Sequence, residues 1–132
     1  MATPVYRAPM RARDRDEPGA AFGLAHGLVG IGDAQAARML HRFEALEDGT
    51  FVWTRDADGW FHLGRIAGPL RRVDSPVGIN CVRPTRWMDR PFPPDAVPAA
   101  VTYTFARGGR NFQRINDRAA EQATFELWTD PV

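Results

Sequence analysis

The chain contains no lysine; all seventeen of its basic side chains are arginine, and sixteen acidic residues nearly balance them. The formal net charge of +1 and the pI near 8.0 exclude a strong overall field that would gather polyanions, so any phosphate contact must come from a local patch. Exclusive use of arginine fits a GC-rich genome at least as well as selection for bidentate contacts to phosphate. Net charge therefore argues neither for nor against a nucleic-acid partner.

Cysteine is almost absent as well. The single thiol, Cys81, can form no disulfide within the chain, and the Cys and His spacing of a zinc site is missing around it. No stretch approaches the roughly 20 apolar residues of a membrane span, and the first residues lack an apolar core of signal-peptide length. These absences predict a cytoplasmic protein without a membrane partner.

Length and composition predict one globular domain over residues 1–132, because 44% of the residues are hydrophobic and no repeat or linker divides the chain. Residues 10–20 are the exception. This segment is dense in charge and contains proline and glycine, which is typical of a mobile surface loop.

The first half of the chain begins with two predicted strands and a helix. Val5–Ala8 fits a short strand, and 27–32 packs apolar residues between glycines, which favours a buried strand over a helix. Asp33 is expected to cap an amphipathic helix that ends near Gly49, because apolar residues recur there at helical spacing.

A hairpin follows this helix. Residues 51–55 and 60–66 are rich in aromatic and β-branched side chains, and 56–59 supplies turn chemistry that ends in a glycine. Residues 79–88 read as a further strand, which Pro84 should place at an edge or a bulge.

The second half of the chain is less regular. Residues 99–107 fit a strand or a short helix, and 111–115 fit an extended segment. Asn116 or Asp117 could cap a last helix over 118–128, with Ala119, Ala120, Ala123 and Leu127 inward. The order of elements predicts an α+β fold, a small, partly closed β-barrel with one helix after the second strand and a C-terminal helix.

No motif predicts catalysis. The glycines of 27–32 depart from G-x-G-x-x-G and no βαβ unit follows them, the three histidines are scattered, and Cys81 lies in an apolar strand. We therefore expect no enzyme, no cofactor and no metal site. The alternative is an enzyme that acts on a nucleotide or small ligand in the barrel mouth, with His62 or an aspartate as general base.

Arginine, amide and indole groups gather at two places. Arg83, Arg86 and Arg90 surround Trp87, while the Gly108-Gly109 turn is flanked by Arg107, Arg110, Asn111, Gln113 and Arg114. Such groups can hold a phosphate, read a base edge and stack on its face. Indoles serve equally well in a core, so at least two of the four tryptophans should be buried. A solvated basic rim around an ordinary barrel is the plainer interpretation.

In serial order, short motifs along most of the chain resemble the PUA-like (SH3-like) barrels, the set that includes EVE domains and the N-terminal domains of Mrr-type modification-dependent restriction enzymes. The matching motifs are Val5-Tyr6-Arg7-Ala8, Gly27-Leu28-Val29-Gly30-Ile31-Gly32, the helix through Phe43, Gly49-Thr50-Phe51-Val52-Trp53, Leu63-Gly64-Arg65-Ile66-Ala67-Gly68-Pro69-Leu70, and Val82-Arg83-Pro84-Thr85-Arg86-Trp87-Met88. The chain departs from the family at Asp33, where an aromatic residue is frequent.

The resemblance implies a non-catalytic module that binds DNA or RNA, often by enclosing a flipped, modified base among aromatic and polar side chains. The implied pocket would be lined by Tyr6, Arg7, Trp53, Trp60, Arg86 and Trp87. We add Arg110 and Asn111 for phosphate and base-edge contacts. The module could supply specificity to a separate effector protein, or be a scaffold that binds another protein or its own copy; the oligomeric state stays open.

Overall fold

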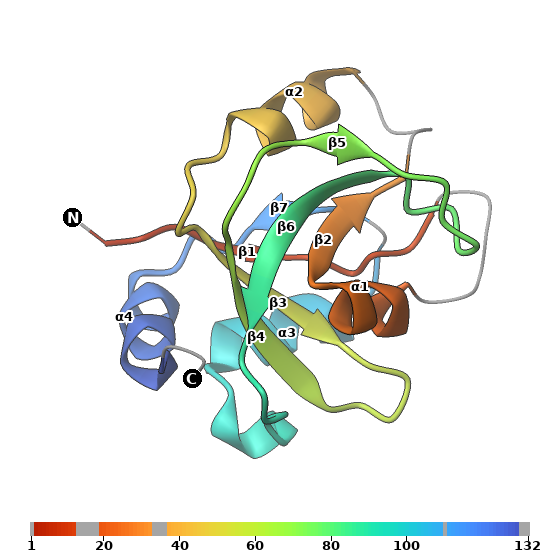
Figure 1. Cartoon of the computed structure of the whole chain (residues 1–132). Coiled ribbons are helices and arrows are strands. Elements are labelled where there is room, and N and C mark those ends of the chain that lie inside the picture. Colours follow the sequence, from red (N-terminus) through yellow and green to blue (C-terminus); the bar gives the residue numbers. More distant parts are fainter. Residues whose placement is uncertain (1, 13–18, 33–36, 110, 130–132) are drawn as a thin grey trace.

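The computed structural model describes residues 2–12, 19–32, 37–109 and 111–129. Its elements, in chain order, are β1 (Val5–Arg7), α1 (Ala20–His26), β2 (Leu28–Ile31), α2 (Ala37–Ala45), β3 (Phe51–Arg55), β4 (Phe61–Ile66), β5 (Arg71–Arg72), β6 (Cys81–Trp87), the 3-10 turn η1 (Pro94–Ala96), α3 (Ala99–Ala106), β7 (Gln113–Arg114) and α4 (Arg118–Leu127). The strands form one sheet in the order β2-β6-β4-β3-β1-β7, with β5 beside β6. The sheet curls, with α2 above it and α4 and α1 on opposite sides (Figure 1), which confirms the predicted α+β, partly closed barrel.

The strand pairing brings the C-terminal ends of β1 and β3 together. β3 and β4 form the predicted hairpin, with Arg55 opposite Phe61 at the turn. β1 pairs with β3 in the parallel direction, with Arg7 beside Trp53. On its other side β1 pairs with β7 in the antiparallel direction. Because parallel strands point the same way, β1 and β3 end at the same edge of the sheet.

The curled sheet separates two hydrophobic cores. Successive strand residues point to opposite faces, so β3 sends Val52 into the core inside the curl and sends Phe51 and Trp53 into the core beneath α3 and α4. Phe43 of α2 enters the first core and Phe105 of α3 enters the second. Both faces of the central strands are therefore covered.

One helix was not predicted, and a second decides between two alternatives that the sequence left open. No helix was expected over α1, which begins after Gly19 without a side-chain cap and ends at Gly27 in the left-handed conformation. For residues 99–107 the helical alternative is right. Val101, Thr104 and Phe105 are buried at helical spacing, whereas Tyr103 is exposed, so the alternating pattern that suggested a strand was coincidental.

Residues at both ends of segment 10–20, which was predicted to be a mobile surface loop, lie in the interior and not at the surface. Met10, Ala12 and Ala20 are buried in the core inside the curl, where they pack against β2 and its neighbours. Residues 13–18, the middle of that segment, lie outside the described residues, as does Asp33, the predicted helix cap.

Pro84 lies in the interior of the sheet, so the prediction of an edge position is wrong. Thr85 donates its backbone N–H to Gly27 of the β2 side, so the nitrogen of Pro84 faces the other way. On that side β6 pairs with β5 as far as Val82 and with β4 from Thr85. Pro84 thus stands where the partner strand changes: its carbonyl accepts the Ala67 N–H at 2.8 Å, and its nitrogen cannot return that bond.

The last helix begins as predicted, and most of its predicted inward face is right. The Asp117 carboxylate caps α4 by accepting the backbone N–H of Ala120 at 2.8 Å. Ala120 is buried and Leu127 packs against the second core, whereas Ala119, also predicted to face inward, is exposed. The pattern missed Thr124, which is buried although it is polar, because its hydroxyl accepts the Trp53 indole N–H at 3.2 Å.

One buried hydroxyl gives a stability prediction. Thr54 is fully buried on β3, and its Oγ1 has no hydrogen-bond partner among the described residues. Thr54→Val removes this hydroxyl and keeps the shape of the side chain, so the free energy of unfolding should rise by about 1 kcal/mol in thermal or urea denaturation. Thr85→Val is the matched control. The Thr85 hydroxyl donates to the Arg83 carbonyl at 3.1 Å, so its removal should not raise the free energy of unfolding. A destabilised Thr54→Val variant would contradict the prediction.

Candidate nucleic-acid interface

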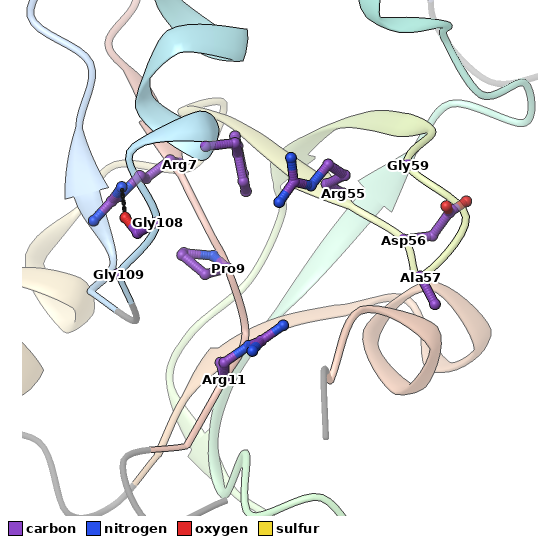
Figure 2. A pocket seen from close by; sticks show the side chains of 10 residues that line it. Arg7, Pro9, Arg11, Arg55, Asp56, Ala57, Gly59, Gly108 and Gly109 are labelled. Carbon is purple, nitrogen blue, oxygen red and sulfur yellow. Dashed lines mark hydrogen bonds between the residues drawn. The ribbon is translucent and has the colours of Figure 1, made fainter. Parts of the chain in front are cut away.

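A pocket of about 340 Å³ opens at the edge where β1 and β3 end. It is lined by Arg7, Pro9, Arg11, Arg55, Asp56, Ala57, Gly59, Phe105, Gly108 and Gly109. Figure 2 shows three of its guanidinium groups, those of Arg7, Arg11 and Arg55, placed around Pro9. The chain after β1, the β3–β4 turn and the end of α3 therefore form one concave site.

Arg7 is the buried base of this pocket and is only 5% exposed. Its guanidinium donates to three backbone carbonyls, those of Thr104 at 2.7 Å, Gly108 at 2.9 Å and Asn111 at 3.1 Å. Among the described residues no carboxylate forms an ion pair with it. Burial lowers the pKa of Arg7, and the positive charge of Arg107 lowers it further, but an arginine remains protonated. The pocket thus holds a buried cation that no carboxylate of the described residues neutralises by an ion pair.

The Gly108-Gly109 turn leaves the space that the Arg7 guanidinium occupies. Gly108 and Gly109 have φ of 78° and 101°, a conformation that side chains disfavour. A Cβ on Gly109 would lie 2.9 Å from Nη2 of Arg7, so any larger residue would press on the guanidinium. The Gly108-Gly109 turn predicted from the sequence is therefore needed for both its backbone conformation and its small size.

Two further guanidinium groups are more accessible. Arg55 is exposed at the end of β3 and lies 5.6 Å from the centre of the Phe105 ring. Arg11 is half-buried and makes no ion pair with the rest of the described chain. Together with Arg7 they create a local positive potential that the net charge of the chain conceals.

Asp56 is the acidic residue in the pocket wall, and its carboxylate braces the hairpin turn. Burial alone would raise the pKa of Asp56, but hydrogen bonds from His62 at 2.8 Å and from the N–H groups of Trp60 and Asp58 outweigh burial and hold it below its ordinary value. A general base needs a pKa nearer to neutral, so Asp56 is poorly suited to that role. His62 is absent from the pocket lining. The His62–Asp56 pair therefore gives the enzyme alternative little support.

The four tryptophans lie in different environments. Trp53 is fully buried against Phe92 beneath α3 and α4, so its predicted place in an open pocket is wrong. Trp60 is 43% exposed and directly follows Gly59 of the pocket wall. Trp87 is half-buried over Gly64, where a Cβ would lie 2.6 Å from its ring, and its indole donates to the Leu28 carbonyl. Trp128 is half-buried beside α4.

The other predicted residues are divided between the two faces of β1. Arg7 lines the pocket described above, whereas Tyr6 and Asn111 line a separate cleft on the opposite face. Arg86 is exposed with its guanidinium 5.9 Å from the centre of the Trp128 ring, and it does not line the Arg7 pocket. Arg110 lies outside the described residues. The single pocket predicted from the resemblance is thus not assembled.

Sequence reasoning missed Arg11, Arg55 and Phe105. A signal was present for Arg55, a charged residue that directly follows the buried run of β3. Arg55 reaches the pocket because β1 and β3 pair in parallel, and the sequence pattern did not predict that pairing.

Three large apolar side chains are exposed on the described surface, namely Trp60, Tyr103 and Phe125. They come from the hairpin, α3 and α4, and Arg107 lies 5.4 Å over the Tyr103 ring. Within the described residues no group of three or more His, Cys, Asp or Glu is placed to bind a metal ion, and no helix is long and apolar enough to cross a membrane.

Neither a family model nor a curated protein sequence matches the chain. Among solved structures, the fold is similar to that of the YTH domain of the Zygosaccharomyces rouxii MRB1 protein, determined in complex with N6-methyladenosine RNA. The two share 14% sequence identity with a TM-score of 0.53, and the match covers 98% of this chain and 89% of the YTH chain. At this identity the likeness establishes a shared curled-barrel fold.

Proposed function

We propose that the protein is a non-catalytic module that binds single-stranded nucleic acid at the pocket around Arg7. The observation that carries the proposal is a buried guanidinium with no carboxylate partner among the described residues, at the base of a pocket that two more arginines line. A phosphate group would supply the missing negative charge and accept charge-assisted hydrogen bonds. Any anion could neutralise this charge, so the charge by itself does not distinguish a nucleotide from another anion.

The rest of the lining suits a nucleotide. Its volume of about 340 Å³ lies at the lower end of small-ligand sites, which run from roughly 300 to 1,000 Å³. The guanidinium planes of Arg11 and Arg55 offer flat surfaces on which a base can stack, and the buried Phe105 ring adds an apolar part to the lining. Trp60 is exposed and directly follows Gly59 of the pocket lining, so its indole is the candidate for a second stacking surface.

A modified base is the finer form of this proposal. The similar fold of the YTH domain was solved with N6-methyladenosine RNA, and the resemblance to modification-dependent PUA-like barrels supports the same class of ligand. A base taken out of its stack needs a preformed pocket to offset a cost of a few kcal/mol. Of the residues that the resemblance implied, Arg7 lines this pocket and Trp60 adjoins it. A separate effector protein would then use the specificity of the module.

The experiment is a fluorescence-anisotropy titration of single-stranded RNA and DNA octamers, with and without N6-methyladenine, against the wild type and Arg11→Gln/Arg55→Gln. We expect the double variant to bind the preferred octamer at least tenfold more weakly. The slope of log affinity against log salt should become shallower by roughly 1.4, about 0.7 for each phosphate of a single strand that the variant no longer neutralises.

The matched control is Arg71→Gln/Arg72→Gln, which removes the same charge from exposed positions on β5 that are not part of the pocket lining. It should retain most of the affinity. Absence of salt-dependent binding by the wild type to every octamer would overturn the proposed function. Equal binding of methylated and unmethylated octamers would contradict recognition of a modified base, while the proposed nucleic-acid site itself would stand.

A further inference from the structure

A second cleft, of about 410 Å³, lies on the other face of β1, between α2 and the β1–β7 edge of the sheet. It is lined by Tyr6, Met39, Arg42, Asn111, Phe112, Gln113 and Arg114. Tyr6 points away from Arg7 because the two are consecutive residues of a strand. The cleft is therefore separate from the pocket around Arg7, although the same strand forms a wall of each.

The cleft has an aromatic floor. The rings of Tyr6 and Phe112 stack with their centres 5.0 Å apart and an interplanar angle of 12°. Phe112 is buried and packs edge-to-face on Phe43 of α2, so the stack is anchored in the core inside the curl. Tyr6 is half-buried and stays partly accessible, and Met39 adds an apolar wall. A flat, partly apolar floor of this kind favours a ring system as ligand.

Polar groups surround this floor. Exposed Asn111 and Gln113 carry amides that can pair with the edge of a base. Arg42 and Arg114 bring positive charge from α2 and from β7. Arg114 donates to the Glu121 carboxylate at 3.3 Å, but an arginine has five N–H donors, so donors remain for a phosphate. Ring-stacking, edge-reading and phosphate-binding groups thus meet in one cleft.

The two sites are joined by a short stretch of chain. Gly108 and Gly109 line the Arg7 pocket, and the segment from Asn111 to Arg114 lines the second cleft. Gly109 and Asn111 are two residues apart, so their Cα atoms are separated by at most about 7 Å. Arg7 also donates to the Asn111 carbonyl, which holds Asn111 close to β1. A ligand of a few nucleotides is long enough to enter both sites.

We infer that the cleft between α2 and the β1–β7 edge is a second nucleotide subsite for the same strand. The inference rests on the proposed function and adds to it that the ligand is a polymer held at two points. Two linked contacts raise the affinity for a strand well above that for a single nucleotide, because binding at the second site becomes intramolecular.

The test compares the single-stranded octamer preferred by the wild type with the corresponding mononucleotide 5′-phosphate. Arg42→Gln/Tyr6→Leu removes a charge and the stacking ring while keeping an apolar side chain against Phe112. We expect this variant to bind the octamer about tenfold more weakly and the mononucleotide, held in the Arg7 pocket, as the wild type does. Arg38→Gln, on the exposed face of α2 and absent from the cleft lining, is the matched control.

Photo-crosslinking gives a readout that does not depend on the Tyr6 substitution being tolerated. An octamer that carries 4-thiouridine should crosslink in the wild type to peptides that contain Tyr6 or 111–114, and Arg42→Gln alone should weaken these crosslinks. Unchanged octamer affinity in both cleft variants, without crosslinks to these peptides, would overturn the second subsite while the Arg11/Arg55 result still supports the first. Failure of the wild type to bind any octamer would instead overturn the proposed function itself.

Discussion

Replacing Trp53 by alanine should lower the free energy of unfolding by about 4 kcal/mol, the largest effect that we expect from a single substitution. The indole is fully buried, packs edge-to-face on Phe92 with ring centres 5.5 Å apart, and donates to the Thr124 hydroxyl. Alanine would leave a cavity beneath α3 and α4 and strand the Thr124 hydroxyl in an apolar site. Urea denaturation followed by far-UV circular dichroism measures the change.

Trp60→Ala is the matched comparison, because Trp60 is 43% exposed and belongs to the adjoining turn. Its removal should change stability by less than about 1 kcal/mol, yet weaken nucleic-acid binding if the indole stacks on a base. Trp53→Phe, which keeps a ring in the core, should fall between the two in stability if alanine prevents folding. Equal losses of stability in the two alanine variants would contradict the assignment of Trp53 to the core.

Arg83→Met should cost about 3 kcal/mol, the second largest effect. Arg83 is 3% exposed, and its guanidinium donates to the carbonyls of Phe43 at 3.0 Å and Leu46 at 2.6 Å, at the C-terminal end of α2. It also donates to the Gly68 carbonyl and pairs with Asp48 at 2.9 Å. Methionine would fill much of the space but leave these carbonyls without a donor.

The control for Arg83 is Arg38→Met, which places the same change on the exposed face of α2. It should shift the unfolding midpoint little. Arg83→Lys separates charge from geometry: a single ammonium cannot reproduce the planar fork, so this variant should lose much of the same stability. A fully stable Arg83→Lys protein would show that charge alone is sufficient there.

Local patterns in the sequence predicted the parts of the fold that local physics determines. The hairpin around Asp56 has alternating aromatic residues and a turn whose carboxylate accepts nearby N–H groups, and the buried strand before α2 is framed by glycines. α1 and α3 lack a side-chain cap, so the sequence offered no start signal for either. They are stabilised by the cores that they cover, which only the whole fold supplies.

The candidate site was predictable only in part for the same reason. Arg7 and the Gly108-Gly109 turn were identified, but their contact joins residues 101 positions apart. Trp53 was assigned to a pocket because aromatic residues suit both stacking and packing, and only the helices on the second face of the sheet decide between the two roles. Arg83, grouped with the arginines around Trp87, instead stabilises the end of α2 from the interior.

The three residues of β1 also bear on how the protein acquires its binding surface. They pair with β3, some forty-five positions later, and with β7, more than a hundred positions later. Contacts between such distant segments carry a large loop-closure cost and slow the folding of small domains. Neither of the two proposed nucleotide sites can form before the last third of the chain has docked against its first residues, so a nascent or truncated chain would lack both pockets.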